Sequence, residues 1–205
     1  MLLTTAVLAQ KIDLKEKFDQ KKIAVVNRNA NSFDEGSNQG IQLDEKSGEG
    51  VVWIEGIDFS KGIIEVDLKG KDEFQKSFLG IAFHGVNDST FDAIYFRPFN
   101  FRTPDSVRRI HAVQYISHPQ YTWKRLRDER NAQFEKAVQP VPDPNDWFHA
   151  KLEVKENEVL VYVNNATSPS LRISKLNDRK NGKLGLWAGE GAGGKYANLV
   201  IKKEL

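Results

Sequence analysis

The chain has 205 residues, of which 40% are hydrophobic and 28% are charged, and its formal net charge is +2. This length supports one sizeable hydrophobic core, and this composition is typical of a globular protein rather than a disordered one. So small a charge argues against nucleic acid as a partner, and no run of about 18 apolar residues indicates a membrane span. Cysteine is absent, which excludes disulfides, thiolate zinc sites and cysteine nucleophiles.

Residues 1–9 are mostly apolar and end in Val7-x-Ala9, which has small residues where a signal peptidase requires them. We interpret this segment as the remnant of a secretory signal, and residues 10–205 as a single domain. This interpretation predicts a periplasmic or extracellular location. The alternative is an apolar N-terminal stub without a targeting role.

The next part of the chain alternates between short strands and polar segments. The charged residues 11–22 predict a frayed helix or a linker, and residues 23–27 predict a first strand. Residues 29–40 are rich in Asn, Ser, Gly and Asp and are expected to form a loop. Further short strands are expected at residues 41–43 and 50–54.

Longer strands, in which apolar and polar residues alternate, follow at residues 62–70, 77–86, 92–101 and 109–117. In the first of them Ile64, Val66 and Leu68 share one face, and Glu65 and Asp67 share the other. Such alternation places one set of side chains in a core and the other set in water or in a groove.

Residues 119–138 interrupt the strands as the only segment dense in helix formers, with Pro119 placed to open a helix. With Trp123 and Arg127, this helix is either a lid over a groove or a solvated cover for a sheet edge. The last strands are expected at residues 147–155, 159–163, 183–187 and 196–201. The pattern predicts an all-β fold, a two-sheet antiparallel sandwich with one short helical insertion.

The C-terminal strands carry a pattern that resembles concanavalin A-like lectin and glucanase jelly rolls. It begins at Asp146-Trp147-Phe148-His149, passes through Val161-Tyr162-Val163-Asn164-Asn165, and ends with residues 182–187 and 196–201. Over residues 59–205 the chain is most similar to the bacterial laminin-G-like and 3-keto-disaccharide hydrolase group, a domain of unknown function. The resemblance implies a jelly-roll β-sandwich. Sugar-binding modules, glycoside hydrolases and domains without an assigned role all share such folds.

The stretch that begins at Tyr95 is the most typical of a ligand site. Alternation places Tyr95, Arg97 and Phe99 on one face of their strand. Aromatic rings offer apolar faces to sugar rings, while Arg and Gln donate to hydroxyl groups. The alternative is that the aromatic residues pack beneath the helical insertion, with arginines stacked on them. The predicted carbohydrate-binding residues are Tyr95, Arg97, Phe99, Gln114, Tyr115, Trp187, His84 and His111.

Glu65 and Asp67 are candidate catalytic acids, because jelly-roll glucanases carry Glu-x-Asp-x-x-Glu or Glu-x-Asp-x-Glu on one strand. Two carboxylates a few ångströms apart can serve as nucleophile and acid. Here Leu68 and Lys69 follow instead of a third acid, so a solvated strand face is the competing interpretation. Glu190 is the remaining candidate acid.

The four histidines form no His-x-x-x-His or His-Glu-x-x-His pattern, so no zinc site is expected. Calcium uses oxygen ligands, which residues 34–38 offer as Asp, Glu, Ser and Asn. The competing interpretation of these residues is an ordinary loop. No other metal or cofactor is expected.

These patterns support three functions. The first is an exported domain that recognises a saccharide on its concave sheet. The second is a glycosidic-bond-cleaving enzyme of the 3-keto-disaccharide hydrolase type, which needs an acid and a partner base that converge in the groove. The third is a structural or interaction module without a small-molecule site. The oligomeric state is left open.

Overall fold

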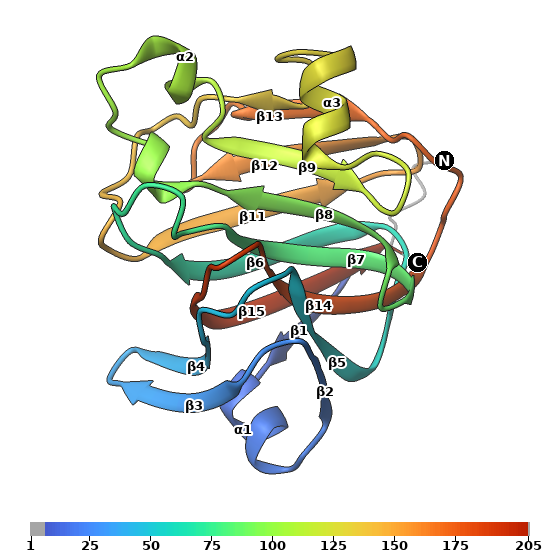
Figure 1. The fold of residues 1–205 in the computed structure, drawn as a ribbon. Coiled ribbons are helices and arrows are strands. Elements are labelled where there is room, and N and C mark those ends of the chain that lie inside the picture. Colours follow the sequence, from blue (N-terminus) through green and yellow to red (C-terminus); the bar gives the residue numbers. More distant parts are fainter. Residues whose placement is uncertain (1–6, 205) are drawn as a thin grey trace.

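Two antiparallel β-sheets pack face to face in the computed structural model, which describes residues 7–204 (Figure 1). Sheet A has the strand order β13-β12-β11-β6-β15-β4-β3, and β1 pairs with β15 beside this path. Its strands are β1 (Val7–Ile12), β3 (Ala30–Glu35), β4 (Asn38–Leu43), β6 (Gly62–Lys69), β11 (Phe148–Val154), β12 (Glu158–Val163), β13 (Leu171–Ser174) and β15 (Gly194–Glu204).

Sheet B has the strand order β10-β9-β8-β7-β14-β5-β2. Its strands are β2 (Ile23–Val26), β5 (Gly50–Phe59), β7 (Leu79–Asn87), β8 (Thr90–Phe96), β9 (Val113–Ser117), β10 (Glu135–Lys136) and β14 (Gly182–Ala188). The helices of the described residues are α1 (Leu14–Asp19), the 3₁₀ helix η1 (Pro98–Asn100), α2 (Ser106–Arg109) and α3 (Trp123–Glu129). None of these helices is long and apolar enough to cross a membrane. The expected all-β, two-sheet antiparallel sandwich is confirmed.

Sheet A follows the alternation of its sequence. Along β6, Ile64, Val66 and Leu68 are fully buried, whereas Glu65 and Asp67 on the opposite face are partly exposed. Full burial of each such aliphatic side chain contributes about 1.5–3 kcal/mol relative to an exposed position. Sheet A therefore turns an apolar face to the core and a polar face to water.

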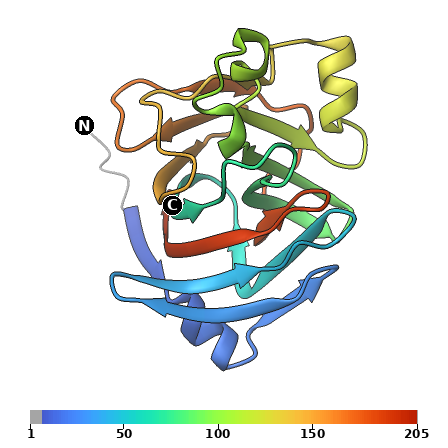
Figure 2. The same ribbon diagram turned by 60° about the vertical axis from the view of Figure 1, so that its left-hand side comes forward.

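Sheet B differs from sheet A because its central strands are buried on both faces. All five residues of β9 are buried. Phe96 of β8 packs on Phe148 of β11, with 5.1 Å between the ring centroids, so the side of β8 that carries Phe96 faces sheet A. The other side is the outer face of sheet B, where α3 packs on β9. Both α2 and α3 lie at the end of the molecule opposite the β3–β4 hairpin (Figures 1 and 2).

The helical insertion is shorter than the expected span 119–138. The helix α3 covers only Trp123–Glu129, and Thr122 caps it by accepting a hydrogen bond from the backbone N–H of Arg125. Residues 135–136 form β10, which pairs with β9. Helix propensity is a local property, whereas strand pairing depends on a distant partner, so the local composition could not reveal β10.

Two expected strands are also shorter. The strand expected at 92–101 ends at Phe96, because Pro98 has no backbone N–H to donate to a neighbouring strand and begins η1 instead. The strand expected at 109–117 begins only at Val113, because Arg109 ends α2, which Asp105 caps, and residues 110–112 form the turn that follows. Both changes leave residues 98–111 outside the strands, and this covering segment lies over the outer face of sheet B.

The N-terminal region forms regular structure in place of the expected linker and loop. The strand β1 pairs with β15, and Asp13 caps α1. The expected loop at 29–40 is the β3–β4 hairpin, which turns at Gly36 with a φ of +69°. Ala9 lies within β1, so a cleavage after Ala9 would divide this strand. Residues 1–6 lie outside the described residues, and export remains a prediction.

Candidate functional site

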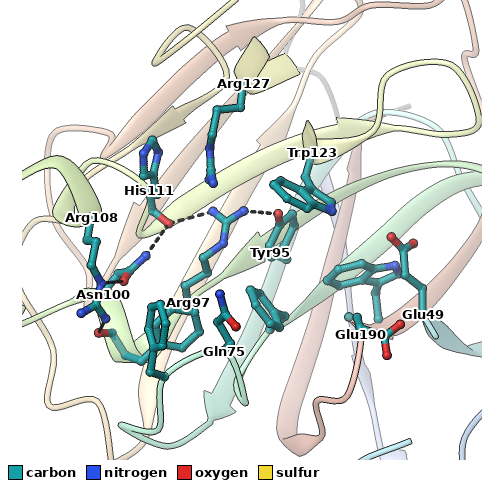
Figure 3. A pocket seen from close by; sticks show the side chains of 15 residues that line it. Glu49, Gln75, Tyr95, Arg97, Asn100, Arg108, His111, Trp123, Arg127 and Glu190 are labelled. Carbon is teal, nitrogen blue, oxygen red and sulfur yellow. Dashed lines mark hydrogen bonds between the residues drawn. The ribbon is translucent and has the colours of Figure 1, made fainter. Parts of the chain in front are cut away.

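The outer face of sheet B carries a cavity of about 410 Å³. Because Phe96 faces sheet A, alternation along β8 points Tyr95 and Arg97 away from sheet A and into this cavity. The aromatic side chains that line it are Phe74, Phe78, Tyr95, Phe99, Trp123 and Trp187. The charged or ionisable side chains are Glu49, Arg97, Arg108, His111, Arg127 and Glu190 (Figure 3). Apolar walls with a few placed polar groups are typical of a small-molecule site.

A row of residues in cross-strand register forms the floor of the cavity: Trp187, Gly80, Tyr95, Gln114 and Glu135. Residues paired in this way project from the same face of a sheet. The rings of Tyr95 and Trp187 meet with 4.7 Å between their centroids. Gly80 lies between them in the row and has no side chain, which leaves room for the two rings to meet.

Replacing Gly80 with alanine is therefore expected to destabilise the protein by about 1–3 kcal/mol. A Cβ at this position would lie 2.0 Å from the backbone oxygen of Ile94 and 2.8 Å from the Cβ of Tyr95, so β8 would have to move. The urea concentration at the unfolding midpoint measures the effect. A midpoint equal to that of the wild type would show that the floor is loosely packed.

Arg97 is the centre of a cluster of buried polar side chains in the floor of the cavity. Its guanidinium donates to the backbone oxygen of His111, to the hydroxyl of Tyr95 and to the side-chain oxygen of Gln114. The Tyr95 hydroxyl donates in turn to Oε1 of Gln114 at 2.7 Å. Burial raises the pKa of Tyr95 to about 12, so the hydroxyl keeps its proton at neutral pH. The orientation of Arg97 is thus set before any ligand arrives.

Glu135, the last residue of this row, is a buried counterion. It is 1% exposed and accepts two hydrogen bonds from Arg127, at 3.0 and 2.7 Å. Its Oε2 also lies 3.5 Å from Nη1 of Arg97 and 2.9 Å from Nδ1 of His111. Burial lowers the pKa of His111, although the charge of Glu135 opposes this shift. With a pKa below the ordinary value of about 6.5, His111 is mostly neutral at pH 7.

The remaining charges of the cavity are separated into two ends (Figure 3). At one end the guanidinium carbon of Arg108 lies 4.3 Å from the ring centroid of Phe74. At the other end Glu190 accepts hydrogen bonds from the hydroxyl of Ser47 and from the backbone N–H that follows it. Glu49 comes from the same loop as Ser47 and lines the same end. The cavity is therefore cationic at one end and anionic at the other.

Arg28 joins the two loops that carry these glutamates. Its side chain is buried, at 5% exposure. Its guanidinium donates to the backbone oxygens of Asn27, Gly48, Ala188, Gly189 and Ala192. Hydrogen bonds from a charged donor are the stronger ones. One buried side chain thus holds loop 44–49 against loop 189–193 at the rim of the cavity.

A second cavity of about 260 Å³ adjoins the first and shares Glu49 and Trp187 with it. It continues over Phe91 and His118, and Nε2 of His118 lies 2.9 Å from a carboxylate oxygen of Glu49. The indole N–H of Trp187 is buried and has no hydrogen-bond partner among residues 7–204.

Several residues that the sequence singles out come together in the first cavity: Tyr95, Arg97, Phe99, His111, Trp187 and Glu190. Gln114 is fully buried and acts on the cavity through Tyr95 and Arg97. Sequence reasoning missed Glu49 and Phe74. Both come from loops that lack a periodic pattern, and only their proximity to charged or aromatic neighbours could have marked them.

Tyr115 and His84 are not brought into the cavity, and the expectation for both is corrected. Tyr115 follows Gln114 in a strand, so it points to the opposite face, between the sheets. There it donates to Oδ1 of Asp92 at 2.7 Å. His84 is fully buried with its Nδ1 3.6 Å from Asp92, and Arg179 completes this cluster with an ion pair of 2.9 Å to Asp92.

Glu65 and Asp67 also lie away from the cavity, on the outer face of sheet A. Glu65 is paired with Lys202 at 2.8 Å, and Asp67 lies 2.8 Å from Nδ1 of His149. Glu190 lies across the molecule in the cavity of sheet B. These three candidate acids therefore do not converge in one site, because they occupy two different sheets.

Residues 34–38, the candidate calcium ligands, belong to the β3–β4 turn. Glu35 is paired with Lys195, and Asn38 accepts a hydrogen bond from Asn198 at 3.0 Å. Within the described part of the chain, no group of three or more His, Asp or Glu side chains is arranged to hold a metal ion. Calcium binding remains a prediction.

No protein-family model and no curated protein matches the sequence. Solved structures match the fold. The carbohydrate binding module CBM66 from Bacillus subtilis has a TM-score of 0.60 at 15% identity, over 88% of this chain and 95% of the module. A Bacillus subtilis protein of unknown function with a galectin-like fold has a TM-score of 0.63 at 16% identity, over all of both chains. A glycoside hydrolase family 16 endo-glucanase from Bacteroides ovatus has a TM-score of 0.56 at 12% identity, over 95% of this chain and 99% of the enzyme.

These likenesses establish the class of fold, a jelly-roll β-sandwich of the concanavalin A-like and galectin-like kind. The expected jelly roll is confirmed. Identities this low show the fold alone, so membership of the laminin-G-like and 3-keto-disaccharide hydrolase group remains a prediction.

Proposed function

We propose that the protein binds a carbohydrate in the cavity on the outer face of sheet B. The observation that carries this proposal is the aromatic lining of the cavity beside polar side chains that include Gln75 and Arg108. A sugar ring has apolar C–H faces, which suit the exposed rings of Trp123 and Phe74, and hydroxyl edges, which suit the polar groups. Solved structures of the same fold include a carbohydrate binding module and an endo-glucanase, which supports a sugar as the ligand.

Hydrolysis of a glycosidic bond is the second candidate, because two carboxylates line the cavity. Both already have partners within the protein. Glu190 accepts hydrogen bonds at both oxygens from its neighbouring loop, and Glu49 lies 2.9 Å from His118. A general acid is normally held protonated by burial or by a neighbouring negative charge, and neither glutamate is buried. Binding without turnover is the better-supported function, and export would place it outside the cytoplasm.

Replacing Trp123 with alanine is expected to weaken saccharide binding about tenfold, or about 1.4 kcal/mol. Trp123 is 43% exposed and lines the cavity, so the change removes a contact surface without opening the core. A glycan array would identify the saccharide, and calorimetric titration of that saccharide into both proteins would measure the change.

The matched control is Val86→Ala. Val86 is 59% exposed and lies outside both cavities, so the affinity should stay at the wild-type value. An array without any bound glycan would refute saccharide binding. Release of reducing sugar from a bound glycan would show that the protein is a hydrolase.

A further inference from the structure

The cationic end of the cavity has more positive charge than its buried counterion neutralises. Arg97, Arg108 and Arg127 all line the cavity. Among the described residues, Glu135 is the carboxylate that forms ion pairs with this set, and it pairs with Arg97 and Arg127. The single negative charge of Glu135 thus faces the two positive charges of Arg97 and Arg127, and Arg108 adds a third positive charge.

Burial strengthens the effect of this excess positive charge on a ligand, because water and salt screen a buried charge less. Arg97 is 3% exposed and Glu135 is 1% exposed, so neither is screened as a surface charge would be. Both oxygens of Glu135 are engaged by Arg127, at 3.0 and 2.7 Å. Arg97 is further away, at 3.5 Å, and its direct hydrogen-bond acceptors are uncharged. The floor therefore presents a positive field to whatever occupies the cavity.

Arg108 adds a second positive charge at the mouth of this end. It donates to the backbone oxygen of Phe99 and to Oδ1 of Asn100, and it lies over the ring of Phe74. These partners are uncharged, and residues 7–204 provide no carboxylate within ion-pair distance of Arg108. Its contacts hold the guanidinium in place without neutralising it. Such a group suits a planar anion, because the guanidinium fork can bind both oxygens of a carboxylate.

The opposite end sets the orientation of a charged ligand. Glu49 and Glu190 line that end and would repel an anion there. An acidic group on the ligand would therefore lie against Arg108, while hydroxyl groups would face the glutamates. This division of charge would select the orientation as well as the class of ligand.

We propose that the saccharide is acidic, with the carboxylate of a uronic acid bound at the end formed by Arg97, Arg108 and Arg127. This inference rests on the proposed function and adds the charge of the ligand and the direction in which it lies. The Arg108 guanidinium contacts the carboxylate directly. Arg97 and Arg127 contribute their field from the floor and the wall.

The experiment compares each acid with a neutral form of the same shape. Oligomers of galacturonic, glucuronic and mannuronic acid are titrated into the protein, each beside its methyl ester. At least one acid should bind about tenfold or more tightly than its ester, since hydrogen bonds to charged groups are the stronger ones. The difference should shrink as NaCl is raised from about 20 to 500 mM. Arg108→Gln should remove the preference for the acid, so that the acid and its ester bind the variant with equal affinity.

Arg102→Gln is the control, because Arg102 lies in the same covering segment, is paired with Asp143 at 2.9 Å and lies outside the cavity. It should keep the preference for the acid. Equal affinity for acid and ester, or binding of neutral glycans alone on the array, would overturn the acidic ligand and leave carbohydrate binding intact. Failure of every acid, ester and neutral glycan to bind would overturn the proposed function itself.

Discussion

Replacement of Arg28 with methionine should lower the free energy of unfolding by about 3 kcal/mol and should abolish measurable ligand binding. The substitution keeps much of the side-chain volume but removes the donors that reach the two rim loops. Buried carbonyl oxygens would then lose their partners, and each unsatisfied group is costly. Both loops that carry Glu49 and Glu190 would lose their common anchor, so the anionic end of the cavity would change shape.

Urea unfolding and calorimetric titration together measure this prediction. The control is Arg172→Met, because Arg172 is a surface arginine, 65% exposed at its side chain and paired with Glu158. An exposed ion pair of this kind contributes about 1 kcal/mol or less. If Arg28→Met and Arg172→Met unfold at the same urea concentration, Arg28 does not anchor the loops.

Replacement of Asp92 with asparagine should destabilise the protein by about 3–5 kcal/mol at pH 7. Asp92 is fully buried, and its Oδ1 accepts hydrogen bonds from Tyr115, Asn177 and Arg179 at 2.7, 2.6 and 2.9 Å. The neutral amide would leave the charge of Arg179 without a counterion. Asp143→Asn is the control, because Asp143 is an exposed partner of an ion pair, and it should change the stability by less than about 1 kcal/mol.

The destabilisation caused by Asp92→Asn should depend on pH. Burial alone would raise the pKa of the Asp92 carboxyl, but nearby His84, the charge of Arg179 and the hydrogen bond from Tyr115 outweigh burial and lower it. The folded pKa therefore lies below the unfolded value of about 3.9, and the unfolded state binds more protons in acid. The contribution of Asp92 is complete above about pH 5 and is lost as the pH falls through the folded pKa.

The difference between the unfolding midpoints of the wild type and of Asp92→Asn should therefore narrow steadily as the pH falls from about 5 to about 3. A difference that stays constant over this range would show that the carboxylate of Asp92 is not stabilised by its neighbours. Binding in the cavity should survive the substitution at a temperature where the variant is folded, because Asp92 lies on the opposite side of sheet B.

The sequence predicts the sandwich well where one face of a strand meets water. In β6 the alternation of Ile64 and Val66 with Glu65 and Asp67 reports the two faces directly. The sequence predicts the ends of strands less well where both faces of a strand are buried. Around Pro98 the aromatic residues continue from β8 into the 3₁₀ helix without a change in polarity. The composition therefore does not indicate where β8 ends.

The candidate site was predictable in its strands and unpredictable in its loops. Strand alternation predicts Tyr95, Arg97 and Trp187, because it places each of them on a defined face. The same rule excludes Tyr115, since it is adjacent to Gln114 in β9 and the two must point in opposite directions. Glu49 and Phe74 depend on how two loops fold over the sheet, and no local period encodes that arrangement.

Burial of the central strands of sheet B on both faces has a consequence for the evolution of this fold. The inner face, with Phe96 against Phe148, maintains the sandwich. The outer face is covered by Phe74, the segment 98–111 and α3, which supply much of the cavity wall. The candidate site and the contacts between the sheets thus lie on opposite faces of sheet B. Substitutions in residues 98–111 and in α3 would therefore alter the cavity while the packing between the two sheets is kept.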